Sequence, residues 1–415
     1  MRGCLRVFGC NRQVVEPHPT KTLLLRHASP LQSRQSYPTL RITISGALRE
    51  SSEFRHARVC GTGSWQRRVN CLAGICLPSS QDWAYVAQMQ IQPGDIVFVI
   101  NPNSGNALHP RQLTAMCRAG TEQAGRRASV VETRSPAEAA EAALAAHDAG
   151  AAAMFGCGGD GTLSSILQGL PVGSQTALGA VPLGTANVWA YETHLPMNPL
   201  AAVTAQLAAL DGTQGEAMWI DSGRVWLTRA DGSIASQRFL LMASWGLDAA
   251  AVNGIAGSER RRRIKRMLGE PAYFLSAMQE AIGRRPWSIS YSLDGQPPRA
   301  VDVGLMTIGN TRMLGTWLEV NPQATVVDGE LDLLLFEGAP WRSLALSPFA
   351  RHGWLPHGPG VSNVKFRRLE VTLHGETPPM QIDGEIGPPT AYAIDVEPRA
   401  LRVLCPNPSA SVLGG

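Results

Sequence analysis

Short apolar runs alternate with helical stretches from residue 89 to residue 214. Five consecutive apolar residues, Ile96–Ile100, end at the turn former Asn101-Pro102 and predict a buried strand. Helices and strands are then expected in alternation, over 110–124, 128–132, 136–149 with Ser135 as N-cap, 151–156, 163–168 and 177–181. This alternation predicts a doubly wound parallel sheet, which binds ligands beyond the carboxyl ends of its strands.

After residue 214 the rhythm changes to short, spaced strands. They are expected over 224–228, 238–243, 287–293, 301–307, 331–336 and 364–373, separated by Asp-Gly turns. A helix predicted over 258–282 interrupts them. The predicted fold class is therefore α/β: a Rossmann-like doubly wound domain over 89–214, which the tail 400–415 is a candidate to join, and an antiparallel β-sandwich domain over 215–399.

Residues 1–88 show neither periodicity, and prolines interrupt them. They hold 12 of the 37 basic residues and 4 of the 33 acidic residues, so their net charge is +8 and that of residues 89–415 is −4. We expect a disordered or non-native N-terminal extension ahead of Met89, the alternative being an organelle-targeting segment with the same bias. The mildly acidic remainder disfavours a nucleic-acid partner.

The extension also contains five of the eight cysteines. The other three, Cys117, Cys157 and Cys405, are too scattered for a disulfide framework, which favours a reducing compartment. No run approaches the ~18 apolar residues of a membrane-spanning helix. We therefore expect a cytoplasmic protein.

The glycine-rich segment Gly156–Thr162 stands between a predicted strand and a predicted helix. Glycines permit positive φ and close backbone approach, so that successive N–H groups can converge on phosphate oxygens at a helix N-terminus. Asp160 in this loop needs a metal, a ribose hydroxyl or an amide as its partner. The alternative is a tight turn with a capping Asp. No GxxxxGK[ST] segment occurs, and the chain has three lysines, Lys21, Lys265 and Lys365, which excludes a Walker loop.

Six segments, taken in order, resemble motifs of the lipid kinase family that includes diacylglycerol kinases, sphingosine kinases and their bacterial relatives. They are Asn101–Gly105 (NPxSG), Gly158–Thr162 (GGDGT), Pro182–Asn187 (PLGTAN), Ser244–Ala249, Asp328–Asp332 (DGxLD) and Asp383–Glu385 (DGE). Two departures bear on lipid preference. Val188 stands where the family often has Asp after PLGTAN, and Leu314-Gly315-Thr316 replaces a glycine triplet.

The resemblance implies a role for each matching residue. Asp383 is implied as general base and Glu385 as a Mg²⁺ or positioning ligand; an extended segment would point both the same way. Asp248 is implied to bind the lipid substrate, and Asp328 and Asp332 to bind an auxiliary metal. The residues implied to bind ATP are Asn101, Ser104, Gly158, Gly159, Asp160, Gly161, Thr162, Gly184, Thr185 and Asn187. Solvated turns are the alternative for both acidic pairs.

We therefore expect an ATP- and Mg²⁺-dependent kinase that phosphorylates a lipid hydroxyl. Diacylglycerol, a sphingoid base, ceramide and phosphatidylglycerol remain open as substrates. The alternatives are an NAD kinase-like enzyme and a catalytically silent lipid- or nucleotide-binding protein. The basic run Arg260–Arg266 is either a solvated helix start or a site of peripheral contact with an anionic membrane, worth ~1 kcal/mol per basic residue. The sequence does not indicate an oligomeric state.

Overall fold

The computed structural model describes residues 20–24, 41–45, 71–72, 75–76, 91–102, 109–256, 271–350 and 359–414. Residues 1–70 and 71–415 form separate compact units. In the first unit, β1 (Thr20–Leu24) pairs antiparallel with β2 (Arg41–Ser45). In the second, β3 (Cys71–Leu72) pairs with β4 (Ile75–Cys76). Most of the expected extension lies outside the described residues, so its character stays a prediction.

The first lobe of the second unit is built on a parallel sheet with the order β8-β7-β5-β6. Its strands are β5 (Ile96–Ile100), β6 (Ala128–Glu132), β7 (Ala153–Gly158) and β8 (Ala177–Pro182). The helices are α2 (Pro110–Gln123), α3 (Pro136–Asp148), α4 (Asp160–Gly169), α5 (Val188–Glu192) and α6 (Pro199–Leu210). Because β5 pairs with both β6 and β7, the strand order reverses beside β5, where such sheets place their ligands.

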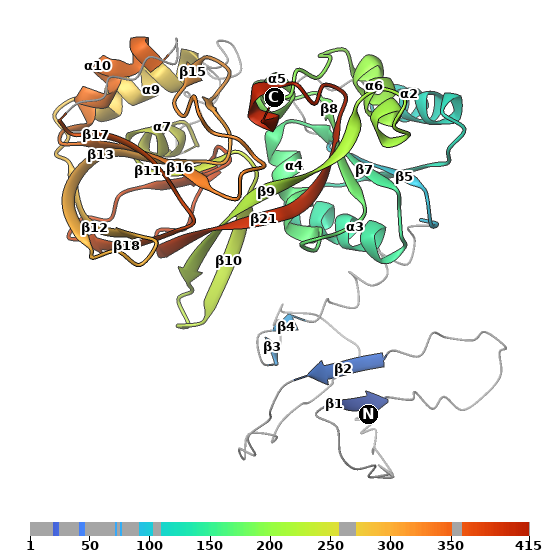
Figure 1. Ribbon diagram of the computed structural model, residues 1–415, viewed down its shortest axis with the longest axis horizontal. Helices are drawn as coiled ribbons and strands as arrows, with labels where there is room; N and C mark the ends of the chain where they lie inside the picture. The colour runs from blue at the N-terminus through green and yellow to red at the C-terminus, as the bar shows by residue number, and fades with distance from the viewer. Residues whose placement is uncertain are drawn as a thin grey trace, which may run out of the picture. The chain divides into compact units, whose positions relative to one another are not determined.

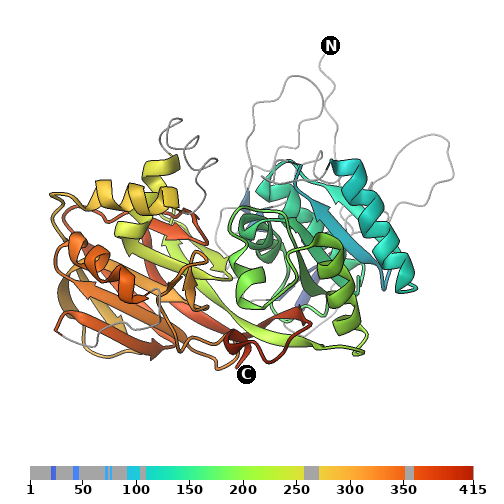
Figure 2. The same ribbon diagram turned by 90° about the horizontal axis from the view of Figure 1, so that it is seen from above.

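Alternate residues of the buried strand β5 serve two different cores. Ile96, Phe98 and Ile100 pack in one cluster with residues of α2 and α6. Val97 and Val99 pack in the other cluster with residues of α3 and α4. Helices therefore cover both faces of the sheet, which accounts for the uninterrupted apolar run and confirms the doubly wound class. Figure 2 shows the sheet between its helices.

The second lobe is an antiparallel β-structure with helices beside it (Figure 1). Its strands are β10 (Ile234–Phe239), β11 (Met242–Gly246), β12 (Trp287–Leu293), β13 (Arg299–Gly309), β16 (Leu331–Glu337), β17 (Val361–Phe366), β18 (Arg368–His374), β19 (Met380–Ile382) and β20 (Glu385–Ile386). A small hairpin pairs β14 (Met313–Leu314) with β15 (Leu318–Glu319). The helices are α7 (Leu247–Ala256), α9 (Pro271–Ala281) and α10 (Pro340–Ala350). A separate apolar core, which includes Trp245, Trp287 and Phe366, stabilises this lobe.

Two long strands connect the lobes (Figure 1). β9 (Glu216–Thr228) pairs antiparallel with β21 (Ala391–Cys405) along most of its length. Near its end β21 also pairs in parallel with β8, Val403 opposite Leu178. The C-terminal strand thus extends the parallel sheet, and a short 3₁₀ helix, η1 (Ser411–Leu413), follows it.

Several boundaries differ from the sequence-based expectation. β7 runs to Gly158 and α4 begins at Asp160, which places the glycine segment in both elements. The strand expected over 364–373 is two strands, β17 and β18. The helix expected over 258–282 is described only from Pro271, and α7 was not predicted. In the described ranges, no helix has the length and apolar character needed to cross a membrane.

Candidate active site

The glycine segment after β7 lies directly against the loop after β8. A Cβ at Gly184 would lie 2.5 Å from the Cα of Gly159, and a Cβ at Gly159 would lie 3.1 Å from the Cα of Gly184. Neither residue has positive φ. Glycine is required at both positions because the two backbones are in contact and leave no room for a Cβ atom. Positive φ, the other common reason for glycine, does not apply here. The GGDGT and PLGTAN segments therefore form one surface.

The Asp160 carboxylate also joins these two loops. Its oxygens accept hydrogen bonds from the amides of Val188 (3.0 Å) and Trp189 (3.1 Å), at the N-terminus of α5. Among the partners that the sequence left open for Asp160, the structure thus shows amides. Asn187, just before α5, has φ 53° and closes its own loop by accepting from Gly184 N (2.8 Å). A negative charge is favourable at a helix N-terminus.

Asp383 and Gly384 form the two-residue turn between β19 and β20. Both have positive φ, 49° and 81°, and Ile382 pairs with Glu385 across the turn. The expectation that Asp383 and Glu385 lie in one extended segment was therefore wrong, because a turn with positive φ at both positions interrupts it.

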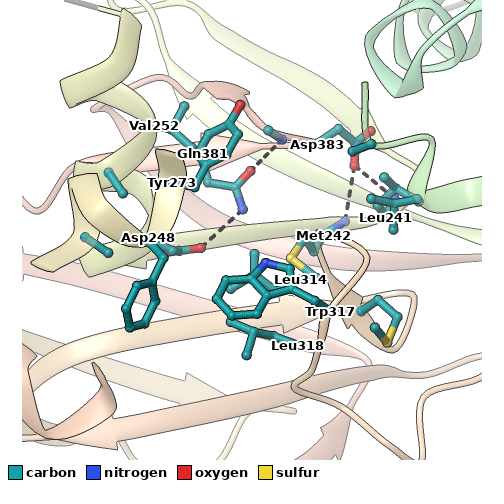
Figure 3. A pocket seen from close by; sticks show the side chains of 18 of the residues that line it. Leu241, Met242, Asp248, Val252, Tyr273, Leu314, Trp317, Leu318, Gln381 and Asp383 are labelled. Atoms are coloured by element: carbon teal, nitrogen blue, oxygen red, sulfur yellow. Dashed lines mark hydrogen bonds between the residues drawn. The ribbon is translucent and has the colours of Figure 1, made fainter. Parts of the chain in front are cut away.

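The Asp383 side chain is buried and held by backbone amides. Its carboxylate accepts from Leu240 N (3.0 Å). It also accepts from Leu241 N (2.9 Å) and Met242 N (3.1 Å), the two residues that Figure 3 labels beside it. Ser164, in α4, also favours the charged form of this carboxylate and so lowers its pKa. Burial raises the pKa of Asp383 to about 6, against the opposing effect of these hydrogen bonds. Through Ser164, Asp383 of the second lobe thus interacts with the helix that follows the GGDGT segment.

Asp248 lies in the first turn of α7. The Ser244 hydroxyl donates to it, as does the amide of Ala249 (2.7 Å). Gln381 Nε2 lies 3.4 Å from its carboxylate, and Gly384 N donates to the other end of that amide (2.8 Å). Figure 3 shows Gln381 between Asp248 and Asp383. Burial raises the pKa of Asp248 to about 6.

Asp160, Asp248 and Asp383 line one cavity of about 330 Å³. Its polar end is lined by Gly159, Asp160, Gly161, Thr185, Gln381, Asp383, Gly384 and Glu385, from both lobes. The rest of it we call the apolar chamber, which is lined by Leu247, Ala251, Val252, Tyr273, Phe274, Ala277, Leu305, Met313, Leu314, Trp317, Leu318 and Leu344. Phe274 and Trp317 meet edge to face at 5.6 Å between ring centroids.

The β14–β15 hairpin, which contributes to the chamber, is attached to the first lobe by Glu192. This residue is the last of α5, and its carboxylate accepts from Met313 N (2.7 Å). Burial raises the pKa of Glu192 to about 7, against opposing hydrogen bonds from Met313 and Thr311. Helix α5 therefore contacts Asp160 at one end and the hairpin at the other.

The predicted site residues divide into four groups. Gly159, Asp160, Gly161, Thr185, Asp248, Asp383 and Glu385 line the cavity. Four further residues belong to the two glycine loops but do not line the cavity: Gly158, Thr162, Gly184 and Asn187. Asn101 N donates to Cys157 O, next to these loops (3.2 Å). Ser104 and Arg260–Arg266 lie outside the described residues. Asp328 and Asp332 do not line the cavity.

Sequence reasoning missed Gln381, Glu192 and the aromatic residues of the chamber. Gln381 had a usable signal, because it stands two residues before Asp383. Glu192 had no such signal, since its role depends on a contact with a segment more than 100 residues away. Trp317 had none either, since it lies in a hairpin whose strands are two residues long.

The residues fit the two expected metal ions differently. Among the described residues, no group of three or more His, Cys, Asp or Glu side chains is arranged to hold a metal. Glu385 is exposed, and its Oε1 would lie 3.5 Å from a Cβ at Gly161, so it can give one oxygen to a Mg²⁺ bound mainly by phosphates. Asp328 and Asp332 do not fit a metal as folded, because the Lys365 ammonium lies between them.

Known proteins resemble this chain over both lobes. Residues 95–218 match the diacylglycerol kinase catalytic domain, and residues 242–405 match the YegS C-terminal NAD kinase beta sandwich-like domain. A Mycobacterium tuberculosis diacylglycerol kinase is 30% identical over 320 residues, 76% of this chain and 96% of that protein. A probable YegS-like lipid kinase of Chromohalobacter salexigens is 30% identical over 254 residues, 59% of this chain and 73% of that protein.

A crystal structure of a putative diacylglycerol kinase from Bacillus anthracis shares the fold. Its TM-score is 0.60 at 18% identity, over 76% of this chain and 99% of that one. With both lobes matched in order around a shared cavity, the chain belongs to the diacylglycerol kinase-like family of lipid kinases, phosphotransferases with an alcohol group as acceptor.

Proposed function

We propose that this enzyme transfers the γ-phosphoryl group of ATP to the hydroxyl of a diacylglycerol-type or sphingoid-type lipid. The observation that carries the proposal is the continuity of the cavity: two glycine loops at its polar end and the apolar chamber beyond. A polar phosphate donor and an apolar acceptor need these two environments side by side.

The polar end is assigned to the ATP phosphates. Helix α4 begins at Asp160 and has no side-chain N-cap, so the amides of its first turn are suited to phosphate oxygens. The Asp160 carboxylate has a partner within the protein, because it accepts a hydrogen bond from the amide of Val188, the first residue of α5. We therefore assign Asp160 to holding the two nucleotide loops together. Asn101, Gly158, Thr162, Gly184, Thr185 and Asn187 shape the same surface.

Asp383 is assigned to accepting the proton of the lipid hydroxyl. It lines the polar end of the cavity together with Gly159 and Gly161, where the γ-phosphate would meet the acceptor. Its amide partners fix its orientation, and a pKa of about 6 leaves it charged at neutral pH and close enough to neutrality to take a proton. Asp248, which is bonded through Gln381 on the chamber side, is assigned to binding the polar part of the lipid.

Glu385 is the residue assigned to Mg²⁺. When bound, the ion would neutralise charge on the transferred phosphoryl group. The exposed carboxylate of Glu385 lies at the N-terminus of α4, beside Gly161. We further propose that the enzyme takes its lipid at the cytoplasmic surface of a membrane, since apolar side chains line the chamber and the run Arg260–Arg266 is strongly basic.

The direct test is a transfer assay with γ-labelled ATP and Mg²⁺. The purified chain is incubated with diacylglycerol, a sphingoid base, ceramide or phosphatidylglycerol in mixed micelles, and with NAD as a competing acceptor. We expect label in one of the first two lipids. Label in NAD would favour the NAD kinase-like alternative, and ATP binding without transfer to any acceptor would favour a silent binding protein.

A further inference from the structure

Lys365 lies between the two carboxylates of the DGxLD segment. It is in β17, directly opposite Asp332 in β16. Its Nζ donates to Asp328 Oδ2 (2.8 Å), Asp332 Oδ2 (3.0 Å) and the carbonyl oxygen of Gln323 (3.2 Å). Three oxygens thus surround one ammonium group, whose three N–H donors they satisfy.

The same oxygens would make a reasonable site for a divalent ion. Carboxylates and a backbone carbonyl are ligands that Ca²⁺ and Mg²⁺ prefer. A second cation within a few ångströms of the ammonium would be repelled by it. We propose that the Lys365 ammonium takes the place of a divalent metal in this chain, so that the second lobe folds without one.

The residue type supports this assignment. The chain has three lysines among 37 basic residues, and Lys365 is the one in the second lobe's described sheet. An ammonium is a compact charge that donates in three directions, whereas the planar guanidinium of arginine suits a flat carboxylate pair. A position surrounded by three oxygens therefore selects lysine in an otherwise arginine-rich protein.

The contacts also explain what the cation stabilises. Asp332 is buried, with 2% of its side chain exposed, so its charge needs a partner. In the adjoining turn, Gly329 N donates to Asp221 Oδ2 (2.7 Å), and Asp221 Oδ1 accepts from Arg399 N (2.8 Å). Lys365 thus fixes the segment between the β14–β15 hairpin and β16 to β17. Asp221, in β9, fixes the adjoining turn to the strands that connect the lobes.

Thermal unfolding of the full chain without nucleotide tests this inference. The midpoint of the wild type should be the same in EDTA and in millimolar Ca²⁺ or Mg²⁺. Lys365→Met, which keeps the aliphatic stem, should unfold at least about 5 °C lower in EDTA, because two carboxylates lose their cation. Added Ca²⁺ should restore part of that loss, since the three oxygens are then free.

Calorimetric titration of wild type and Asp328→Asn with Ca²⁺ gives a second measurement, which does not depend on the folding of the lysine variant. We expect the two proteins to behave alike. Wild-type binding that Asp328→Asn abolishes would overturn the inference, as would a Lys365→Met protein that matches the wild type in EDTA. None of these readouts depends on which reaction the cavity performs.

Discussion

Asp383 is bonded to the amides of three consecutive residues, Leu240–Met242, and this arrangement determines what a substitution there does. A hydrogen bond to a charged group contributes about 1.5–3 kcal/mol. Asparagine replaces one acceptor oxygen with a donor and removes the charge. A change at Asp383 therefore affects both the proposed proton transfer and the junction before β11.

Asp383→Asn is expected to lower kcat by roughly 10²–10⁴, the range of a general base, and to lower the unfolding midpoint as well. The KM for ATP should change little. Ser164→Ala is the matched control, because it removes a hydroxyl that influences the pKa of Asp383 and keeps the carboxylate. Steady-state kinetics at a temperature where both variants are folded gives the comparison. A folded Asp383→Asn protein with normal kcat would assign the proton to another group, with Asp248 the next to test.

Lowering the pH should have opposite effects on kcat and on the free energy of unfolding. Burial raises the pKa of Asp383 and Asp248 to about 6, so kcat should fall as pH drops below 6. The folded state binds these protons more tightly than the unfolded state, whose carboxyls have pKa near 3.8. The contribution of both groups to stability therefore rises as pH falls from 6 toward 4. An activity that stays flat down to pH 5 would contradict the assignment of the base.

Helix α5 makes hydrogen bonds to other segments at both of its ends. Its first amides bind Asp160 of the GGDGT segment, and its last residue, Glu192, binds the β14–β15 hairpin. One short helix thus connects the two glycine loops to the wall of the apolar chamber.

Glu192→Ala should raise the KM for lipid several-fold while the KM for ATP stays nearly constant. The Met313 amide loses its acceptor, at a cost of about 1–3 kcal/mol, but the bonds of Asp160 to α5 remain. Glu192→Gln retains an acceptor oxygen and serves as the matched control. Kinetics with each substrate varied in turn would show the difference. Equal effects on both KM values would mean that Glu192 stabilises the fold generally.

The elements also show what the sequence could predict. The buried run Ile96–Ile100 and the N-cap Ser135 carry local signals, and each was found in its predicted place. The neighbouring sequence does not reveal why glycine is needed at position 159 or which groups bind Asp160. Both depend on contacts with a loop about 25 residues later. Lys365 beside Asp328 and Asp332 likewise depends on the register of β16 with β17.

At the scale of the whole molecule, β9 and β21 extend from one lobe into the other. Strand pairing fixes the second lobe to the parallel sheet. The fold itself therefore forms the cavity, which extends from the glycine loops into the apolar chamber. Neither family match extends before residue 95.

Removal of residues 1–88 should therefore leave folding and lipid phosphorylation nearly unchanged. The reason is that the described strands of the two lobes begin at β5, residue 96. Comparison of the full chain with residues 89–415 by thermal unfolding and phosphoryl transfer checks this. An insoluble or inactive truncated protein would show that the extension is part of the structure.

The proposed function requires the lipid acceptor to occupy the apolar chamber. Ala277 lines the chamber from α9, whereas Leu275, on the same helix, is exposed and outside the lining. The most direct measurement is phosphorylation of long-chain and short-chain lipid by Ala277→Trp, with Leu275→Trp as control. We predict that Ala277→Trp raises the KM for long-chain lipid about tenfold or more, a loss of ~1.4 kcal/mol, while ATP binding and Leu275→Trp stay near wild type. Unchanged kinetics of Ala277→Trp with every lipid would contradict the account.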